Sequence, residues 1–495
     1  MVRMFTRLCA AAAAFGVGVA DPSPVDRPHP YPAGTKLGTD RVFVVTPSEG
    51  FATQTGPISH VIYLNRCSGG CSVTQSDHND ARNHLSTMVK PGTSVLTEFA
   101  NTAGQVGSAA DAEWGQVVQC LREVYSPFDV ALTDQQPPAN QAYTELMIAG
   151  QPTDLGFSPQ ILGVAPVHID CNAYDNAIAF AFANHQSAIN RVLGICWTAA
   201  QESAHNFGLD HEFQFSDGQS ACNDPMTYRT DCGGQKFFRN KSALCGETMA
   251  RPCLCPGNQN SHQKLVSLFG PGMALTGKPE VAILFPTDGA MLSTGQVVQI
   301  KAKSARGIAR IELWLNGHKW AEVAGAPFGV NGQEQTIYTL PIPPRVPNSA
   351  LDIVAKAFDD LEIESDSSTV EAVKGAPCAS ADTCLKGQLC DAGKCYWDPP
   401  AGELGATCTY NEFCMTGLCA GDPGGQTCSQ TCIVNSADGC PSGFECVPTD
   451  DVNGICLRPD SGGCCSVDRD RGTALWFHGC IAAWVLVRAL RRRRR

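Results

Sequence analysis

Hydrophobic positions in the first half of the chain recur with two different periods. Apolar residues at positions 114, 117, 118, 121 and 124 fall at helical spacing, which predicts a helix over residues 109–125. A second helix is expected over residues 187–207. Short apolar runs bounded by turn residues predict strands at 60–65, 128–132, 145–149, 162–167 and 177–183. This order of elements predicts an α/β or α+β domain, which we place at residues 58–277.

The pattern changes between residues 278 and 374, where strand-like runs follow one another without a helical segment. Turn residues such as Asp288-Gly289 and Asn316-Gly317 separate them. The predicted strands are 281–285, 297–302, 308–315, 337–340 and 351–358. These short strands predict a β-sandwich of immunoglobulin type. The segment resembles the Ig-like modules that many secreted bacterial enzymes carry.

Residues 375–460 are poor in large apolar side chains and hold twelve cysteines. Cys378, Cys384, Cys390 and Cys395 are separated by five, five and four residues, and part of this spacing repeats further on. Such a stretch cannot be stabilised by an apolar core alone, so disulfide-linked repeats are predicted. Zinc binding by the thiols is the alternative, and the lack of paired C-x-x-C spacings argues against it.

The N-terminal residues 1–20 have the features of a secretory signal peptide. Arg3 and Arg7 precede an apolar stretch, and small residues precede Asp21. An N-terminal membrane anchor is the alternative. Residues 21–57, rich in Pro, Gly and Thr, are expected to form a linker or a short pro-segment.

The C-terminal residues 461–495 combine Cys464-Cys465, a short apolar stretch and five terminal arginines. This arrangement resembles the C-terminal sorting signals of myxobacterial surface proteins, which implies export and processing near the cysteine pair. A permanent single transmembrane anchor is the alternative. Both interpretations predict an exported protein, at the cell surface or outer membrane or released outside the cell, that contacts the membrane through this segment.

Composition supports export and limits the possible partners. The chain has 26 cysteines among 495 residues, and disulfides are expected in an exported protein. Ten of these cysteines lie within residues 58–277, an even number that predicts disulfides there too. Cys222 and Cys232 flank Met226, so bridges should pin the loop between them to the floor of the site. The net charge of −12 argues against nucleic acid as a partner.

Residues 201–211 read Q-E-S-A-H-N-F-G-L-D-H. In a helix, Gln201 and His205 lie one turn apart on the same face, with Glu202 beside them. Gly208 can take a positive φ and end the helix, so that His211 returns toward the same point. Three ligands with an open fourth position make the geometry of a catalytic zinc, whose bound water a neighbouring carboxylate can deprotonate.

This run resembles the motif H-E-x-x-H-x-x-G-x-x-H of the metzincin zinc endopeptidases. The clan also has a methionine turn beneath the metal, and residues 224–228 (D-P-M-T-Y) fit that turn around Met226. The resemblance implies hydrolysis of protein or peptide substrates by metal-activated water. It also implies Glu202 as general base, Tyr228 as a residue that binds metal or steadies the oxyanion, and zinc held by Gln201, His205 and His211.

Gln201 departs from the family pattern, because the family has histidine there. A neutral amide oxygen suits calcium or magnesium better than zinc, so zinc would be held weakly or not at all. Two functions follow: an unusual but working peptidase, or an impaired pseudopeptidase that acts as a surface binding or adhesion protein. The retained Glu202 favours activity. Glu212 is expected to face solvent.

Overall fold

The computed structural model describes residues 41–46 and 58–459, apart from residues 139, 231, 423, 435–438 and 451. They form two compact units: the residues up to Ala379 together with Asp391–Cys395, and Ser380–Cys390 together with the residues from Tyr396 onward. The expected signal peptide and the C-terminal tail lie outside the described residues. Within the described residues, no helix is both long and apolar enough to cross a membrane.

The first domain is built on a six-stranded sheet. In spatial order its strands are β1 (Arg41–Thr46), β8 (Gly163–His168), β9 (Ile178–Ala181), β7 (Thr144–Ile148), β2 (Val61–Asn65) and β6 (Ala131–Thr133). From β9 to β6 the strands run parallel, whereas β8 runs antiparallel to β9. Four of the five predicted strands are confirmed, and the fifth, predicted at 128–132, overlaps β6 only at Ala131 and Leu132. β1 was not predicted: it lies in the expected linker, yet its backbone pairs with β8 in parallel.

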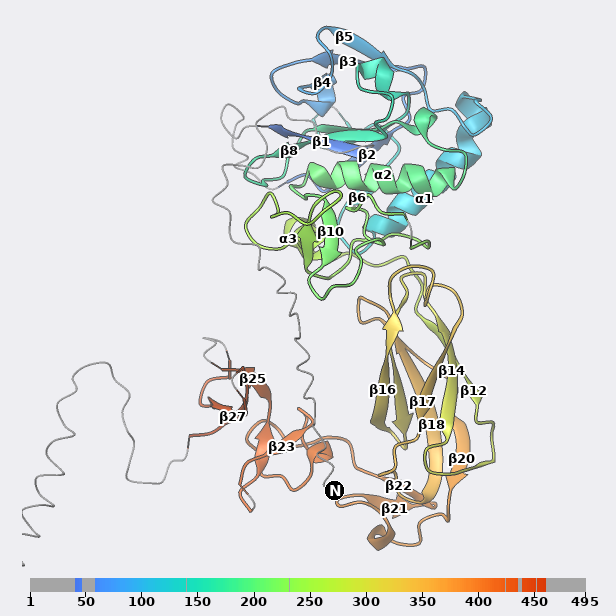
Figure 1. The fold of residues 1–495 in the computed structure, drawn as a ribbon, viewed down its shortest axis with the longest axis vertical. Coiled ribbons are helices and arrows are strands. Elements are labelled where there is room, and N and C mark those ends of the chain that lie inside the picture. The colour runs from blue at the N-terminus through green and yellow to red at the C-terminus, as the bar shows by residue number, and fades with distance from the viewer. Residues whose placement is uncertain are drawn as a thin grey trace, which may run out of the picture. The chain divides into compact units, whose positions relative to one another are not determined.

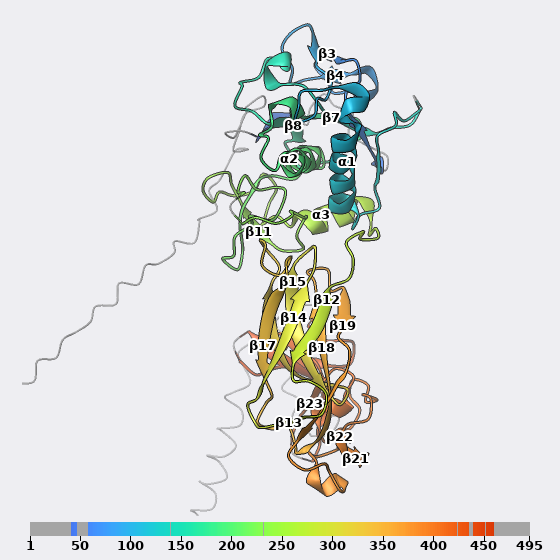
Figure 2. The same cartoon turned by 90° about the vertical axis from the view of Figure 1, so that its right-hand side faces the viewer.

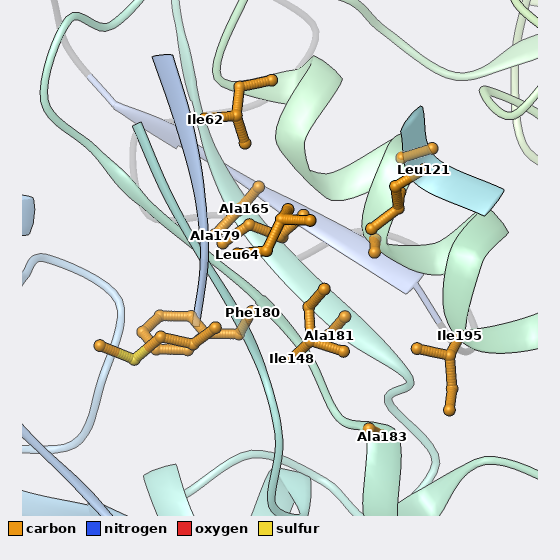
Figure 3. Close-up of a cluster of buried hydrophobic side chains, with 14 of the residues drawn as sticks. Ile62, Leu64, Leu121, Ile148, Ala165, Ala179, Phe180, Ala181, Ala183 and Ile195 are labelled. Atoms are coloured by element: carbon orange, nitrogen blue, oxygen red, sulfur yellow. The ribbon is translucent and has the colours of Figure 1, made fainter. Parts of the chain in front are cut away.

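Two helices cover one face of this sheet (Figures 1 and 2). They are α1 (Asp111–Tyr125) and α2 (Arg191–His205), both close to the predicted bounds and joined by the Cys120–Cys196 disulfide. Their apolar faces and the sheet enclose the core, where side chains such as Leu64, Ile148 and Ile195 are fully or almost fully buried (Figure 3).

The remaining elements of this domain were not predicted. On the other face of the six-stranded sheet lies a small sheet of β4 (Leu85–Ser86), β3 (Cys71–Gln75) and β5 (Thr93–Leu96). After α2 follow β10 (Glu212–Phe215), β11 (Ala243–Cys245) and the helix α3 (Ser261–Phe269). Single 3-10 turns lie at Ala81–Asn83, Gly107–Ala110, Pro152–Leu155 and Ala183–His185.

The Ig-like module has two sheets. One consists of β12 (Glu280–Phe285), β14 (Val297–Lys303) and β17 (Thr336–Pro341). The main strands of the other are β13 (Ala290–Leu292), β20 (Val370–Lys374), β18 (Ser349–Phe358), β15 (Ile308–Leu315) and β16 (His318–Ala326), with β19 (Glu364–Asp366) beside β18. All five predicted strands are present. Strict alternation in β18 buries Leu351, Ile353 and Ala355, as a two-layer sandwich requires.

Within the first unit, a buried charge cluster joins the Ig-like module to the first domain. Asp360 forms ion pairs with Arg306 (2.6 Å) and with Arg239 (2.9 Å) of the first domain. Both arginines are almost fully buried. Burial opposes ionisation of Asp360, but the two arginines outweigh it and lower its pKa to about 2. One carboxylate therefore neutralises part of the charge of two buried guanidinium groups.

The cysteine-rich segment of residues 375–460, most of which belongs to the second unit, is held by disulfides, as predicted. Its cysteines pair as 408–419, 414–428, 432–446 and 440–456, and Cys378, Cys384, Cys390 and Cys395 are disulfide-bonded too. The strands are short: β21 (Leu389–Asp391), β22 (Lys394–Tyr396), β23 (Leu418–Ala420), β24 (Thr427–Ser429), β25 (Thr431–Ile433), β26 (Glu445–Pro448) and β27 (Asn453–Leu457), with 3-10 turns at Ala381–Thr383 and Asn411–Phe413. Cys408, Cys414 and Cys428 themselves form a small buried cluster, so the sulfur atoms supply the core.

Candidate metal centre

The last turn of α2 carries three of the predicted site residues. Gln201, Glu202 and His205 are all fully buried. Neither the oxygen nor the nitrogen of the Gln201 amide has a hydrogen-bond partner among the described residues. An unsatisfied buried polar group costs about 1–3 kcal/mol. The amide therefore lies where an additional ligand would stabilise it.

Just beyond α2, the chain turns back as predicted. Gly208 has a φ of +80°, and a Cβ on this residue would collide with the backbone carbonyl of Cys171. Both the conformation and the space require glycine here. After the turn His211 is fully buried, and its Nε2 lies 3.0 Å from Nε2 of His205. The two histidines of the motif thus converge.

The outer nitrogens of both rings determine which tautomers are present. Nδ1 of His205 lies 2.7 Å from the carbonyl oxygen of Leu209, and Nδ1 of His211 lies 3.1 Å from Oε1 of Glu247. A carbonyl and a carboxylate only accept, so each Nδ1 carries the hydrogen. Each Nε2 then directs a lone pair toward the other. Two nitrogens on a tetrahedral zinc at about 2.0–2.1 Å would be roughly 3.3 Å apart, close to the observed spacing.

Both imidazoles are held in the neutral form that a metal requires. Burial lowers the pKa of His205 well below its usual value, and the neighbouring His211 lowers it further. Burial also lowers the pKa of His211, although Glu247 opposes the shift. Because burial disfavours an imidazolium, a proton shared between the two rings is disfavoured. A divalent metal ion, by contrast, binds neutral imidazole. Two histidines and the unsatisfied amide of Gln201 fit a zinc ion.

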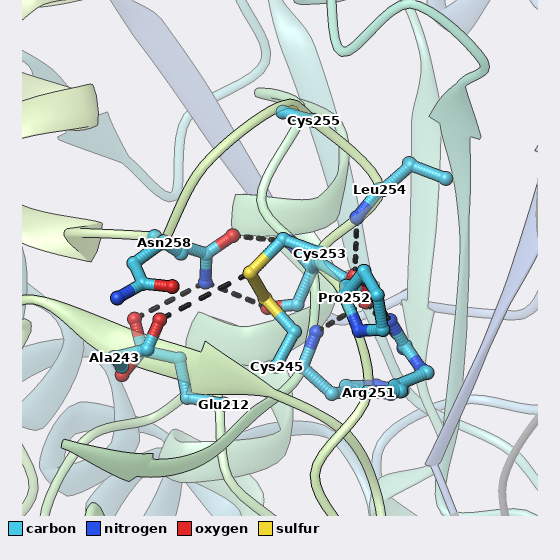
Figure 4. The surroundings of a disulfide bond; sticks show 12 residues. Glu212, Ala243, Cys245, Arg251, Pro252, Cys253, Leu254, Cys255 and Asn258 are labelled. Carbon is cyan, nitrogen blue, oxygen red and sulfur yellow. Dashed lines mark hydrogen bonds and ion pairs between the residues drawn. A yellow bond between two sulfur atoms is a disulfide. The ribbon is translucent and has the colours of Figure 1, made fainter. Parts of the chain in front are cut away.

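Glu247 was not recognised from the sequence. It accepts hydrogen bonds from His211 and from Arg251 (2.6 Å), and Arg251 also forms a two-pronged ion pair with Asp210 at 2.6 Å. Burial opposes ionisation of Glu247, yet these bonds hold its pKa well below the usual range. The Cys245–Cys253 disulfide closes the loop that carries both residues (Figure 4).

Asp210, His211 and Glu247 together offer oxygen and nitrogen atoms close enough to hold a cation. The guanidinium of Arg251, however, already bonds to both carboxylates. This cluster therefore supports His211 and is not itself a metal site. The signal in the sequence was weak: an acidic and a basic residue four apart between two cysteines.

The predicted methionine turn lies close to His211. Met226 is fully buried, and the carboxylate of Asp224 accepts from the backbone N–H groups of Met226 (2.9 Å) and Arg239 (2.8 Å). Cys222 and Cys232 are disulfide-bonded, as expected, but to each other, so the bridge closes the loop on itself and does not tie it to the floor of the site. The Tyr228 ring packs on the ring of His211 with centroids 4.5 Å apart.

The expectation that Glu212 faces solvent is wrong. Its side chain is almost fully buried, because β10 pairs with β11 and Gln259 covers the carboxylate with a hydrogen bond of 3.1 Å. Burial raises the pKa of Glu212 well above its usual value, and the nearby Asp224 raises it further. Glu212 is therefore part of the packed floor of the site.

Glu202 packs against the sheet at Gly163, the first residue of β8. A Cβ at position 163 would lie 2.6 Å from Cγ of Glu202 and 2.7 Å from Cγ2 of Thr198. The φ of Gly163 lies outside the left-handed region, so its backbone conformation alone does not call for glycine. Glycine is required at position 163 because the Glu202 side chain occupies the space that a Cβ would take.

Comparison with known proteins identifies one module. The family described as "Bacterial Ig domain" matches residues 279–340, which confirms the predicted Ig-like module. No curated protein matches the chain. Among solved structures, the fibronectin(III)-like modules of CbhA from Clostridium thermocellum are 16% identical over 19% of this chain and 96% of that one, with a TM-score of 0.15. Wild-type OgpA from Akkermansia muciniphila is 12% identical over 66% and 98%, with a TM-score of 0.16. At these TM-scores neither likeness bears on the fold or the chemistry of the first domain.

Proposed function

We propose that the first domain is a metzincin-type zinc endopeptidase whose metal ligands are Gln201, His205 and His211. The observation that supports this most directly is the pair of Nε2 atoms 3.0 Å apart, each with its lone pair directed toward the other. The unsatisfied amide of Gln201, one helical turn earlier on the same face, supplies the third donor.

The chemistry follows from the neighbouring side chains. A bound zinc ion would polarise the scissile carbonyl and make water nucleophilic at neutral pH. Glu202, next to a metal ligand on α2, takes the proton from the attacking water and passes it to the leaving amine. The ring of Tyr228 packs on His211, and in this proposal its hydroxyl stabilises the developing oxyanion.

The setting is consistent with an enzyme that acts outside the cytoplasm. The disulfides of both units suit an oxidising compartment. We therefore propose that the chain is exported and either held at the cell surface through its C-terminal residues or released. Its substrates are proteins or peptides.

The test uses the purified full chain, Glu202→Gln and Gln201→His. We expect about one equivalent of zinc in all three and cleavage of an unfolded protein by the wild type. Glu202→Gln should keep the zinc and lose cleavage, and Gln201→His should bind zinc at least about 10–100-fold more tightly.

The pseudopeptidase alternative predicts a different result. If the wild type neither holds zinc nor cleaves, while Gln201→His does both, the scaffold is that of an enzyme impaired by this one residue. If Gln201→His is also inert, the peptidase proposal is wrong.

A further inference from the structure

We propose that Glu247 is a positioning residue that offsets the weak amide donor at position 201 by orienting and strengthening His211 as a zinc ligand. This inference rests on the proposed zinc site. It concerns the affinity for metal and not the cleavage step itself.

The geometry holds His211 from two sides. Oε1 of Glu247 lies 3.1 Å from Nδ1 of His211, and the N–H of Gly246 donates to the carbonyl oxygen of His211 at 3.0 Å. Gly246 thus fixes the backbone of His211, and Glu247 fixes its ring. With Nδ1–H bonded to the carboxylate, only Nε2 is left to coordinate, and it already faces His205.

Arg251 holds the carboxylate in place. Its guanidinium bonds to both oxygens of Glu247, at 2.6 and 3.2 Å, and to both oxygens of Asp210. Asp210 in turn accepts from the backbone N–H groups of His211 and Leu254. The Cys245–Cys253 disulfide closes this short loop. Glu247 therefore has little freedom to leave His211.

The electronic consequence links Glu247 to the unusual residue at position 201. A carboxylate that accepts the Nδ1–H raises the basicity of the coordinating Nε2. A site with two imidazoles and a neutral amide is a poorer zinc site than one with three imidazoles. A stronger His211 ligand thus compensates for the weak Gln201 ligand. The contribution of Glu247 to zinc affinity should decrease once a third imidazole is present.

A double-mutant cycle tests this coupling in the full chain. Zinc affinity is measured by competition with a chromophoric chelator for the wild type, Glu247→Gln, Gln201→His and the double variant. We expect Glu247→Gln to weaken zinc binding about 10–100-fold in the wild type, and less than about 3-fold in the Gln201→His background. The d–d absorption of the Co²⁺-loaded protein should change between the wild type and Glu247→Gln, and change less between Gln201→His and the double variant.

Glu113→Gln is a matched control. Glu113 and Glu247 are each 16% exposed, and their partners Arg191 and Arg251 are 7% and 10% exposed. The first pair lies away from the histidines. Its loss should lower the melting temperature of the metal-free protein but leave zinc affinity unchanged. If Glu247→Gln does not fold, Glu247→Asp keeps the charge, withdraws it from His211 and should also weaken zinc binding.

The outcomes separate this inference from the proposed function. If zinc binds, responds to Glu247 and yet no substrate is cleaved, the peptidase proposal fails and the positioning role stands. Unchanged zinc affinity in both Glu247 variants overturns the positioning role, whatever the activity. An equal loss in the wild-type and Gln201→His backgrounds overturns the offset, and so does a wild type that binds no zinc.

Discussion

Gly163→Ala should impair catalysis without impairing metal binding. The added Cβ would lie 2.6 Å from Cγ of Glu202 and 2.7 Å from Cγ2 of Thr198, whereas carbon atoms in contact are best separated by about 3.5–4.0 Å. Glu202 must therefore move by roughly 1 Å, a displacement that can cost about 100-fold in rate. This corresponds to about 3 kcal/mol in the activation barrier.

The assay is kcat/KM for cleavage of an unfolded protein, together with zinc content and the melting temperature. We expect the loss in kcat, one equivalent of zinc, and an overpacking cost of about 1–3 kcal/mol in the free energy of unfolding. Gly115→Ala on the exposed side of α1 is the matched control, because nothing lies within 4 Å of its added Cβ and the helix gains about 0.5–1 kcal/mol. A folded Gly163→Ala protein with wild-type kcat would refute the reasoning that Glu202 is the base.

Three further predictions concern other parts of the first unit. The pKa of His262 is lowered from 6.5 to about 4 by burial, so the unfolded chain binds the extra proton first as the pH falls. The free energy of unfolding should decrease by about 3 kcal/mol between pH 6.5 and 4, and His262→Leu should flatten this slope in urea titrations. Asp360→Asn should lower the free energy of unfolding by about 3–5 kcal/mol, because two buried arginines lose their counter-charge. Asp217→Asn, at an exposed ion pair, should lower it by under about 1 kcal/mol. Equal losses in the two variants would contradict this prediction. Tyr228→Phe should lower kcat about 100–1000-fold and leave zinc affinity unchanged, and an unaltered kcat would remove the hydroxyl from the mechanism.

Local patterns were sufficient to predict much of the first unit. The helical spacing of apolar residues placed α1, because its apolar face packs on the sheet. The i, i+4 spacing of Gln201 and His205 needed only the helix, and Gly208 only its steric freedom. These features depend on residues within a few turns of one another.

The missed features depend on contacts between distant segments. Glu247 reaches His211 across 36 positions, and only the folded loop between Cys245 and Cys253 brings them together. Glu212 is buried by β11 and Gln259, which its neighbours in the sequence do not reveal. β16 escaped prediction because His318–Ala326 lacks a continuous apolar run, and it forms on the edge offered by β15.

The pairing of β1 with β8 has a consequence for how the sheet meets other chains. Along Gly163–His168, β8 pairs with β9 only at its first two residues, whereas the strand of residues 41–46 runs beside all six along the other edge. Were that strand to detach, the sheet would present an open row of N–H and C=O groups beginning at the glycine that touches Glu202. An extended polypeptide would then be able to pair with β8 as an added strand. By occupying this edge near Glu202, β1 keeps other polypeptides from pairing there.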